Sequence, residues 1–268
     1  MLSFHPFDRK KHTLVETLNS LSILYTPTNK ILVMTKYLVF SDIHGASLAP
    51  VREMFEARKV DVGICIGDFD RVYSAREAKS IQKDHPLYVA PGNHDQAHLY
   101  KRTISSGRLR DQGVTSNELW DEWDNDQEAT KYINDMLNNN SEDGKSGRSL
   151  SLDVGGLSTR AIHGGLAGTH ITEPADLWNR IESEEDYMAN FSIMRQYGIK
   201  LLLRGHDHEV QYARLDPKTG FKKYDANGGK FNLFDRREHI VSPGAYFKGE
   251  VAVITTGESN PVVEFKQF

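Results

Sequence analysis

Short apolar runs alternate with amphipathic segments in the first part of the chain. Runs rich in β-branched and aromatic residues at 37–41, 61–66 and 86–90 predict three strands. Apolar residues at helical spacing in 48–58 predict a helix after the first strand, and 75–82 is a second predicted helix after the second strand. Strands that alternate with helices in this way predict an α/β fold with parallel strands.

This alternation stops after the third strand. Apolar residues at helical spacing in 117–137 predict helical structure there, and 138–147 is typical of a loop. We therefore expect a helical insertion at about 105–148, in a position to cover a site. Its tryptophans, Trp120 and Trp123, fit packing against the domain better than a substrate platform.

The second half of the chain predicts a further set of strands. A Gly-Gly pair joins the strands 149–154 and 157–162 as a hairpin. A helix is expected at about 174–197, followed by a buried strand at 199–203. From residue 209 onward, short β-like runs alternate with turns, which predicts antiparallel strands at the end of the domain.

The segment 1–33 differs from the rest because it mixes charged residues with Pro and Thr and has no strand-and-turn punctuation. The first strand follows Met34 almost directly. We therefore predict an N-terminal extension at 1–33, as from an over-long start-site assignment, and a folded domain at 34–268. The alternative is an N-terminal helix packed on the domain.

Composition is that of a globular protein, and 268 residues can bury a full core. The net charge of −4 disfavours non-specific nucleic-acid binding. No apolar stretch approaches the length of a membrane span, and the charged N-terminal stretch lacks the form of a secretory signal. We therefore expect a cytoplasmic protein with no membrane partner.

The single cysteine, Cys65, excludes an internal disulfide and a thiolate metal cluster. It lies within the apolar run 62–66, which predicts a small buried hydrophobic residue rather than a nucleophile. Any metal site must therefore be built from carboxylate, imidazole and amide ligands.

Polar motifs occur where predicted strands end. Loops at the carboxyl ends of parallel strands converge on one crevice, so residues that are distant in sequence can meet there. Each motif alone recurs by chance, and a lone histidine at a strand end is usually a polar turn residue. The ordered combination carries the prediction. The motifs are Asp42-Ile43-His44, Gly67-Asp68, Gly92-Asn93-His94-Asp95, His163-Gly164-Gly165 and Gly205-His206-Asp207-His208.

The ligand types narrow the chemistry. Asp42 and His44 are two residues apart, as are His206 and His208, which spans roughly 6.5 Å of extended chain. Such pairs suit two ions about 3.5–4 Å apart. Carboxylate, imidazole and amide ligands favour Mn²⁺, Fe or Zn²⁺ over Cu(I) or an iron–sulfur cluster. Two cations need a bridging anion, and Asp68 is the candidate.

Taken in order, the motifs resemble those of the calcineurin-like metallophosphoesterase superfamily, over about residues 37–255. The resemblance implies a four-layer α/β/β/α fold with two mixed β-sheets between helices. It also implies two divalent metal ions at the sheet ends, with Mn²⁺ expected before Fe, Zn²⁺, Ni²⁺ or Mg²⁺. By motif position, Asp42, His44 and His208 would bind one metal, Asn93, His163 and His206 the other, and Asp68 would bridge them.

The same resemblance implies that His94 and Asp95 form a catalytic dyad that faces the substrate. The sequence Gly-Asp-Phe-Asp-Arg at 67–71 is one residue shorter than the Gly-Asp-x-x-Asp-Arg of phosphoprotein phosphatases, which weakens the transfer of a phosphate contact to Arg71. The His-Gly-Gly motif is similar to that branch. Gly-His-x-His and the Ser-Pro-Gly at 242–244 are closer to small prokaryotic phosphodiesterases.

The expected activity is that of a hydrolase, a phosphodiesterase or phosphatase acting on a small or nucleotide-like phosphoester. A hydroxide between the two metals would attack phosphorus, and His94, oriented by Asp95, would protonate the leaving group. One alternative is a protein or dinucleoside-polyphosphate phosphatase, and another is a non-catalytic scaffold of the same fold. The sequence does not define an oligomeric state. Tyr246 fits a core or surface position better than stacking on a base.

Overall fold

The computed structural model describes residues 34–99, 112–138, 145–167, 180–216, 218–233, 236–257 and 260–268. The predicted extension, parts of the predicted insertion and the start of the predicted helix 174–197 lie outside these ranges. Within them, no helix combines the length and the apolar character that crossing a membrane requires.

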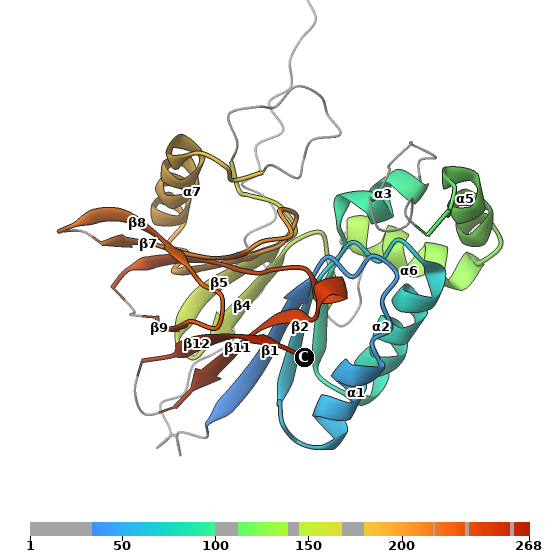
Figure 1. Ribbon diagram of the computed structural model, residues 1–268, viewed down its shortest axis with the longest axis horizontal. Helices are drawn as coiled ribbons and strands as arrows, with labels where there is room; N and C mark the ends of the chain where they lie inside the picture. Colours follow the sequence, from blue (N-terminus) through green and yellow to red (C-terminus); the bar gives the residue numbers. More distant parts are fainter. Residues whose placement is uncertain are drawn as a thin grey trace, which may run out of the picture. The chain divides into compact units, whose positions relative to one another are not determined.

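The first of two mixed six-stranded sheets has the strand order β3-β2-β1-β11-β12-β9 (Figure 1). β1, β2 and β3 are parallel to one another, whereas β11, β12 and β9 each pair antiparallel with their neighbours. The bounds of the strands are β1 Thr35–Ser41, β2 Val62–Ile66, β3 Leu87–Ala90, β9 Lys230–Asn232, β11 Glu250–Thr256 and β12 Val262–Gln267.

The second sheet has the order β4-β5-β6-β10-β7-β8. Its central strands β5, β6 and β10 are parallel, and β4, β7 and β8 pair antiparallel with their neighbours. The bounds are β4 Leu150–Val154, β5 Leu157–Ile162, β6 Leu201–Arg204, β7 Val210–Asp216, β8 Gly220–Asp225 and β10 Glu238–Pro243. The expectation of two mixed sheets is confirmed.

Three apolar cores separate the layers, because successive side chains of a strand point to opposite faces. Leu38 and Phe40 of β1 pack with the helices beside the first sheet, whereas Val39 packs between the two sheets. A third core joins the second sheet to one long helix. The order helices, sheet, sheet, helix is the predicted four-layer α/β/β/α fold.

The helices are α1 Ala49–Glu56, α2 Val72–Asp84, α3 Asn93–Leu99, α5 Ser116–Asp124, α6 Gln127–Leu137 and α7 Glu184–Gln196, with a 3₁₀ turn η2 at Tyr246–Lys248. The pattern over 117–137 forms two helices because Asp126 accepts a hydrogen bond from the Ala129 backbone N–H and so caps a new helix. Helix α7 begins later than predicted, because Ser183 and Asp186 form a capping box.

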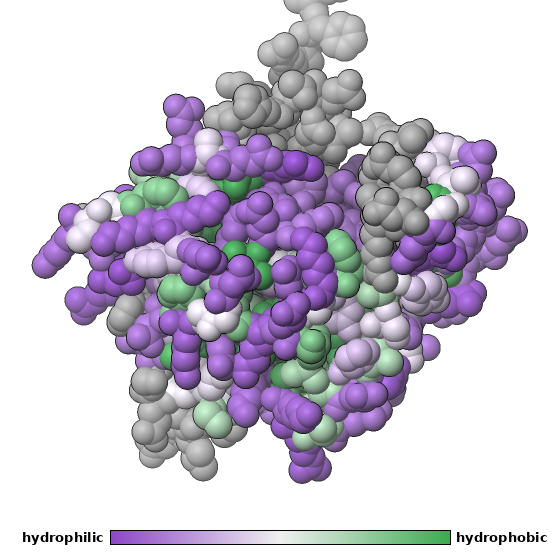
Figure 2. Space-filling view, in the orientation of Figure 1, coloured by the Kyte–Doolittle hydropathy of each residue, from purple (hydrophilic) through white to green (hydrophobic). Residues whose placement is uncertain are grey.

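Apolar side chains are mostly enclosed. The face in Figure 2 is largely hydrophilic, with apolar residues in small separate areas. Cys65 is buried, as predicted, and burial raises the pKa of its thiol. Tyr246 is also buried, and its hydroxyl donates to the Ser47 carbonyl oxygen at 2.9 Å, so of the two expected positions it takes the core one.

Candidate metal centre

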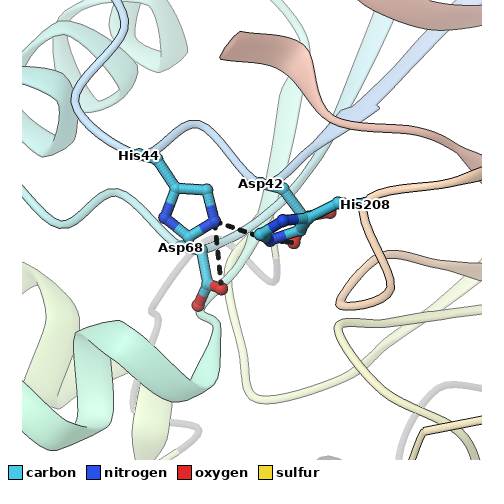
Figure 3. Close-up of side chains that lie close together, drawn as sticks. All are labelled: Asp42, His44, Asp68 and His208. Carbon is cyan, nitrogen blue, oxygen red and sulfur yellow. Dashed lines mark hydrogen bonds and ion pairs between the residues drawn. The ribbon is translucent and has the colours of Figure 1, made fainter. Parts of the chain in front are cut away.

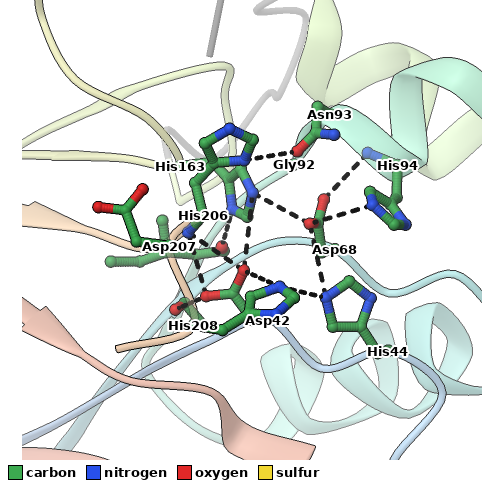
Figure 4. A network of polar contacts seen from close by, with 12 residues as sticks. Asp42, His44, Asp68, Gly92, Asn93, His94, His163, His206, Asp207 and His208 are labelled. Atoms are coloured by element: carbon green, nitrogen blue, oxygen red, sulfur yellow. Dashed lines mark hydrogen bonds and ion pairs between the residues drawn. The ribbon is translucent and has the colours of Figure 1, made fainter. Parts of the chain in front are cut away.

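The predicted ligand motifs meet at the carboxyl ends of strands from both sheets. β1, β2 and β3 carry the first three motifs, and β5 and β6 carry the other two. Each of these two sets is parallel, so its strand ends lie on the same edge of the sheet. Figure 4 shows the predicted ligands converging; they are Asp42, His44, Asp68, Asn93, His163, His206 and His208.

A first group of ligand atoms comes from Asp42, His44, Asp68 and His208, whose side chains face one another in Figure 3. One ligand atom from each residue lies within 4.8 Å of the others. His208 Nε2 is 3.3 Å from Asp42 Oδ1 and 2.8 Å from His44 Nε2. Two carboxylates and two imidazoles at this spacing can surround one divalent cation.

A second group comes from Asp68, His163 and His206, again with ligand atoms within 4.8 Å of one another. His163 Nε2 is 3.1 Å from Asp68 Oδ2, and the Asn93 amide oxygen is 3.0 Å from His206 Nδ1. Asp68 is therefore common to both groups. A shared carboxylate is the feature that two neighbouring cations need to offset their mutual repulsion.

Hydrogen bonds at Nδ1 set the tautomers of two buried histidines. His163 Nδ1 donates to the Ile66 carbonyl oxygen at 2.7 Å, and His44 Nδ1 donates to Asp70 Oδ2 at 2.6 Å. In a neutral imidazole protonated at Nδ1, the Nε2 atom holds a lone pair. The Nε2 lone pair of His163 therefore faces Asp68 Oδ2, and these atoms repel unless a proton or a metal cation lies between them. The residues fit divalent cations.

The electrostatics favour positive charge at this position. Burial alone would raise the pKa of Asp68 and lower that of His163, but their attraction outweighs burial. The pKa of Asp68 falls well below its usual range, and that of His163 rises to about 9. Burial and the nearby His163 lower the pKa of His206 to about 3 and so keep its imidazole neutral. Metals bind ionised carboxylates and neutral imidazoles, so a bound cation would take the place of the proton on His163.

The partner predicted for His94 is wrong. His94 Nδ1 donates to Asp70 Oδ1 at 2.6 Å, and the other oxygen of the same carboxylate accepts from His44. Burial would lower the pKa of His94, but Asp68 and Asp70 raise it to about 10. Asp70 therefore joins the candidate site, where the Gly-Asp-Phe-Asp spacing at 67–70 was the available signal.

Asp95 hydrogen-bonds to the backbone around the loop that follows β2 and the start of α3. Its carboxylate accepts the N–H groups of Gly92 at 2.7 Å, Phe69 at 2.8 Å and Asp68 at 3.0 Å. The expected loop at this position is the helix α3, and successive side chains on a helix point about 100° apart. Asp95 therefore ties the loop that carries Asp68 to the start of α3.

Left-handed backbone is concentrated at the motifs. Among the described residues other than glycine, those with positive φ are Asp42, His44, Arg58, Asp68, Asp70, His206 and His208. All but Arg58 belong to the ligand groups or contact them. Such conformations cost about 1–3 kcal/mol each and persist where the surrounding structure enforces them, which is typical of functional sites.

Arg71, the predicted substrate-binding residue, lies beside the insertion. Its Nε atom is 2.6 Å from Glu122 Oε2 on α5, and its side chain is about one-third exposed at 31%. The predicted phosphate contact stays a prediction.

Phe247, which the sequence did not single out, lies edge-on to two predicted ligands. Its ring centroid is 5.3 Å from that of His44 and 5.6 Å from that of His208. Beside it, Ser41 Oγ donates to the Gly244 carbonyl oxygen at 3.1 Å, which joins the Ser-Pro-Gly segment to the end of β1. No local sequence pattern marks an aromatic residue for such a position.

Comparison with solved structures supports the fold. A metallophosphoesterase from Sphaerobacter thermophilus superposes with a TM-score of 0.59 at 17% identity, covering 88% of this chain and 88% of that chain. A hypothetical protein from Pyrococcus horikoshii superposes with a TM-score of 0.54 at 14% identity, covering 87% of each chain. At these identities the likeness establishes the fold alone. A search among curated proteins found no match.

The family model for calcineurin-like phosphoesterases matches residues 35–210, which includes the five ligand motifs at the strand ends. The match spans more than half of the chain and agrees with the two mixed sheets and the grouped carboxylate and imidazole ligands. The chain belongs to the calcineurin-like phosphoesterase family.

Proposed function

We propose that this protein is a hydrolase that cleaves a small or nucleotide-like phosphoester with two divalent metal ions. The observation that carries the proposal is Asp68, whose carboxylate belongs to both groups of ligand atoms. A non-catalytic scaffold would have no need to keep both groups complete. Family membership supports metal-dependent phosphoester chemistry in general.

The ligand sets follow the two groups. Asp42, His44 and His208 would hold one ion, and Asn93, His163 and His206 would hold the other, with Asp68 between them. Bound divalent ions supply positive charge for the phosphoryl oxygens and lower the pKa of water. Mn²⁺ is our first choice because it accepts carboxylate, amide and imidazole ligands together.

His94 has the geometry of a proton donor to the leaving oxygen. Its Nδ1 donates to Asp70 Oδ1, and its Nε2 lies 4.0 Å from Asp68 Oδ2, so this nitrogen points toward the carboxylate shared by the two ligand groups. Its backbone N–H donates to Asp68 Oδ1 at 3.0 Å, which fixes the ring next to the shared carboxylate. A donor held at both its ring and its backbone loses little entropy when it transfers a proton.

The space beside His208 supports an organic substituent on the phosphate. A cavity of about 580 Å³ is lined by His208, Val210, Lys223, Tyr224 and Lys248, among others. This volume is within the range of ligand pockets, roughly 300–1,000 Å³. The lining is mixed, with Lys223 and Lys248 beside Glu209, Asp225 and Glu250, so it is the volume that favours a phosphodiester or a substituted monoester over inorganic phosphate compounds.

The test is a screen of phosphomonoesters, phosphodiesters, cyclic nucleotides and dinucleoside polyphosphates with added Mn²⁺. We expect hydrolysis that a chelator abolishes and Mn²⁺ restores. At saturating Mn²⁺, His94→Ala should cut turnover by about 10²–10⁴-fold while the amount of bound metal is unchanged. Metal loss in that variant would refute the proton-donor role, and purified protein that neither binds Mn²⁺ nor hydrolyses any ester would establish the scaffold alternative.

A further inference from the structure

Helix α5 makes polar contacts with consecutive residues of the loop that follows β2. The Trp123 indole N–H donates to the Asp70 carbonyl oxygen at 2.9 Å. The neighbouring residue on the same helix, Glu122, accepts a hydrogen bond from the Val72 backbone N–H through its Oε1 atom at 2.9 Å. The other oxygen of Glu122 is 2.6 Å from Arg71 Nε. One helical turn of the predicted insertion therefore holds residues 70, 71 and 72.

Asp70, one of these three residues, links two histidines of the candidate site. Asp70 is fully buried, with a left-handed backbone at φ +58°, and its two carboxylate oxygens accept from His44 and His94. A non-glycine residue in this conformation needs enforcement from its surroundings. A hydrogen bond on its own carbonyl oxygen fixes the orientation of the peptide group that follows, and thereby the direction of the carboxylate.

We infer that Trp123 and Glu122 are positioning residues: Trp123 holds the Asp70 carbonyl oxygen and Glu122 holds the Val72 N–H, and together they fix the loop so that the Asp70 carboxylate points at His44 and His94. This inference rests on the proposed function, since its effect on turnover requires that the site hydrolyses a phosphoester. The helix thus belongs to the working site although none of its residues is a candidate ligand.

Packing alone is the competing explanation, because Trp123 is only 2% exposed and belongs to the core beside the first sheet. The same helix offers a matched control. Trp120 is half-buried, and within the described part of the chain its indole Nε1 makes no hydrogen bond. Trp120→Phe therefore makes the same chemical change as Trp123→Phe without removing a contact to the loop.

The experiment compares both variants with the wild type in the full chain. The loss of one hydrogen bond that holds the active geometry should lower kcat about tenfold. We expect Trp123→Phe to lower kcat about tenfold at saturating Mn²⁺ with KM within about twofold, and Trp120→Phe to leave kcat within about twofold. Mn²⁺ binding, followed by electron paramagnetic resonance, should weaken about threefold or more in Trp123→Phe only, because Asp70 also orients His44.

A double-mutant comparison tests the route through Asp70. If Trp123 acts by aiming this carboxylate, Trp123→Phe should cause less than about a twofold further loss of Mn²⁺ affinity in an Asp70→Ala background, where no acceptor for His44 remains. Glu122→Gln is the second variant, for use if Trp123→Phe does not fold; it keeps an acceptor for Val72 and removes the charge beside Arg71. It should lower Mn²⁺ affinity by about twofold to threefold.

Three results would overturn the inference: equal kcat and Mn²⁺ affinity in Trp123→Phe and wild type, equal losses in the two tryptophan variants, or losses that multiply in the Asp70→Ala background. A wild-type protein that hydrolyses no ester would instead refute the proposed function. In that case the comparison of Mn²⁺ affinities still decides whether α5 positions Asp70.

Discussion

Replacing Asp70 by Asn tests the central contact of the site. The change keeps size and shape but converts one carboxylate oxygen into an NH₂ group. In the structure both oxygens accept an imidazole N–H at 2.6 Å, one from His94 and one from His44. Asparagine can accept only one of these bonds, so one Nδ1–H donor must face an amide donor in a buried environment.

The magnitude follows from the contact that is lost. Hydrogen bonds to charged groups contribute about 1.5–3 kcal/mol, and every 1.4 kcal/mol is about tenfold. If the amide oxygen stays with His44, the loss falls on His94, and kcat at saturating Mn²⁺ should decrease about 10–100-fold. If it stays with His94, the loss falls on His44, and the Mn²⁺ concentration for half-maximal activity should rise by about 10–100-fold.

The assay is initial rate against Mn²⁺ concentration on the best ester from the screen, with bound metal measured in parallel. Asp84→Asn is the control because it makes the same change on α2 at a side chain that is 64% exposed. If Asp70→Asn keeps both kcat and half-saturating Mn²⁺ within about threefold of wild type, the carboxylate does not orient either histidine during the reaction, and the reasoning fails.

Three further predictions concern stability and metal binding. The raised pKa values of His94 and His163, to about 10 and 9, mean that their stabilisation is fully present below the unfolded value of 6.5 and lost as pH rises through 9–10. The Tm in EDTA should therefore fall over pH 6.5–10, and saturating Mn²⁺ should flatten the curve; an unchanged slope would contradict this. Gly92→Ala should weaken Mn²⁺ binding by at least about tenfold in calorimetry, because a Cβ would lie 1.9 Å from Asp68 Oδ1. Asp126→Ala removes the cap of α6 and should lower the free energy of unfolding by about 1 kcal/mol in urea titrations, without altering Mn²⁺ affinity.

The ligand groups could be predicted from sequence because each motif directly follows a strand. Asp42 follows β1 and Asp68 follows β2, and parallel strands bring such residues to one edge whatever the details of the loops. Hydrophobic periodicity likewise predicted the alternation of strands and helices. Both inferences depend on regular backbone, in which the direction of a side chain follows from its position.

The contacts that the sequence left out depend on irregular backbone. Asp70 was visible as a carboxylate two residues after Asp68, but its left-handed conformation decides which groups it reaches. His94 and Asp95 are adjacent in sequence, yet the unexpected helix α3 separates the directions of their side chains. Adjacency is therefore a poor guide to hydrogen-bond partners where a strand turns into a helix.

The position of Asp70 also links metal binding to proton donation. A carboxylate that accepts from His44 with one oxygen and from His94 with the other is a single rigid group, so a shift that improves one contact strains the other. A ligand of one proposed metal and the proposed proton donor are therefore coupled through two hydrogen bonds of equal length. Any element that moves Asp70 acts on both at once. Helix α5 is such an element, because Trp123 and Glu122 hydrogen-bond to the loop backbone on either side of Arg71. Sequence changes within the insertion could thus adjust metal affinity and proton donation together while every ligand stays in place.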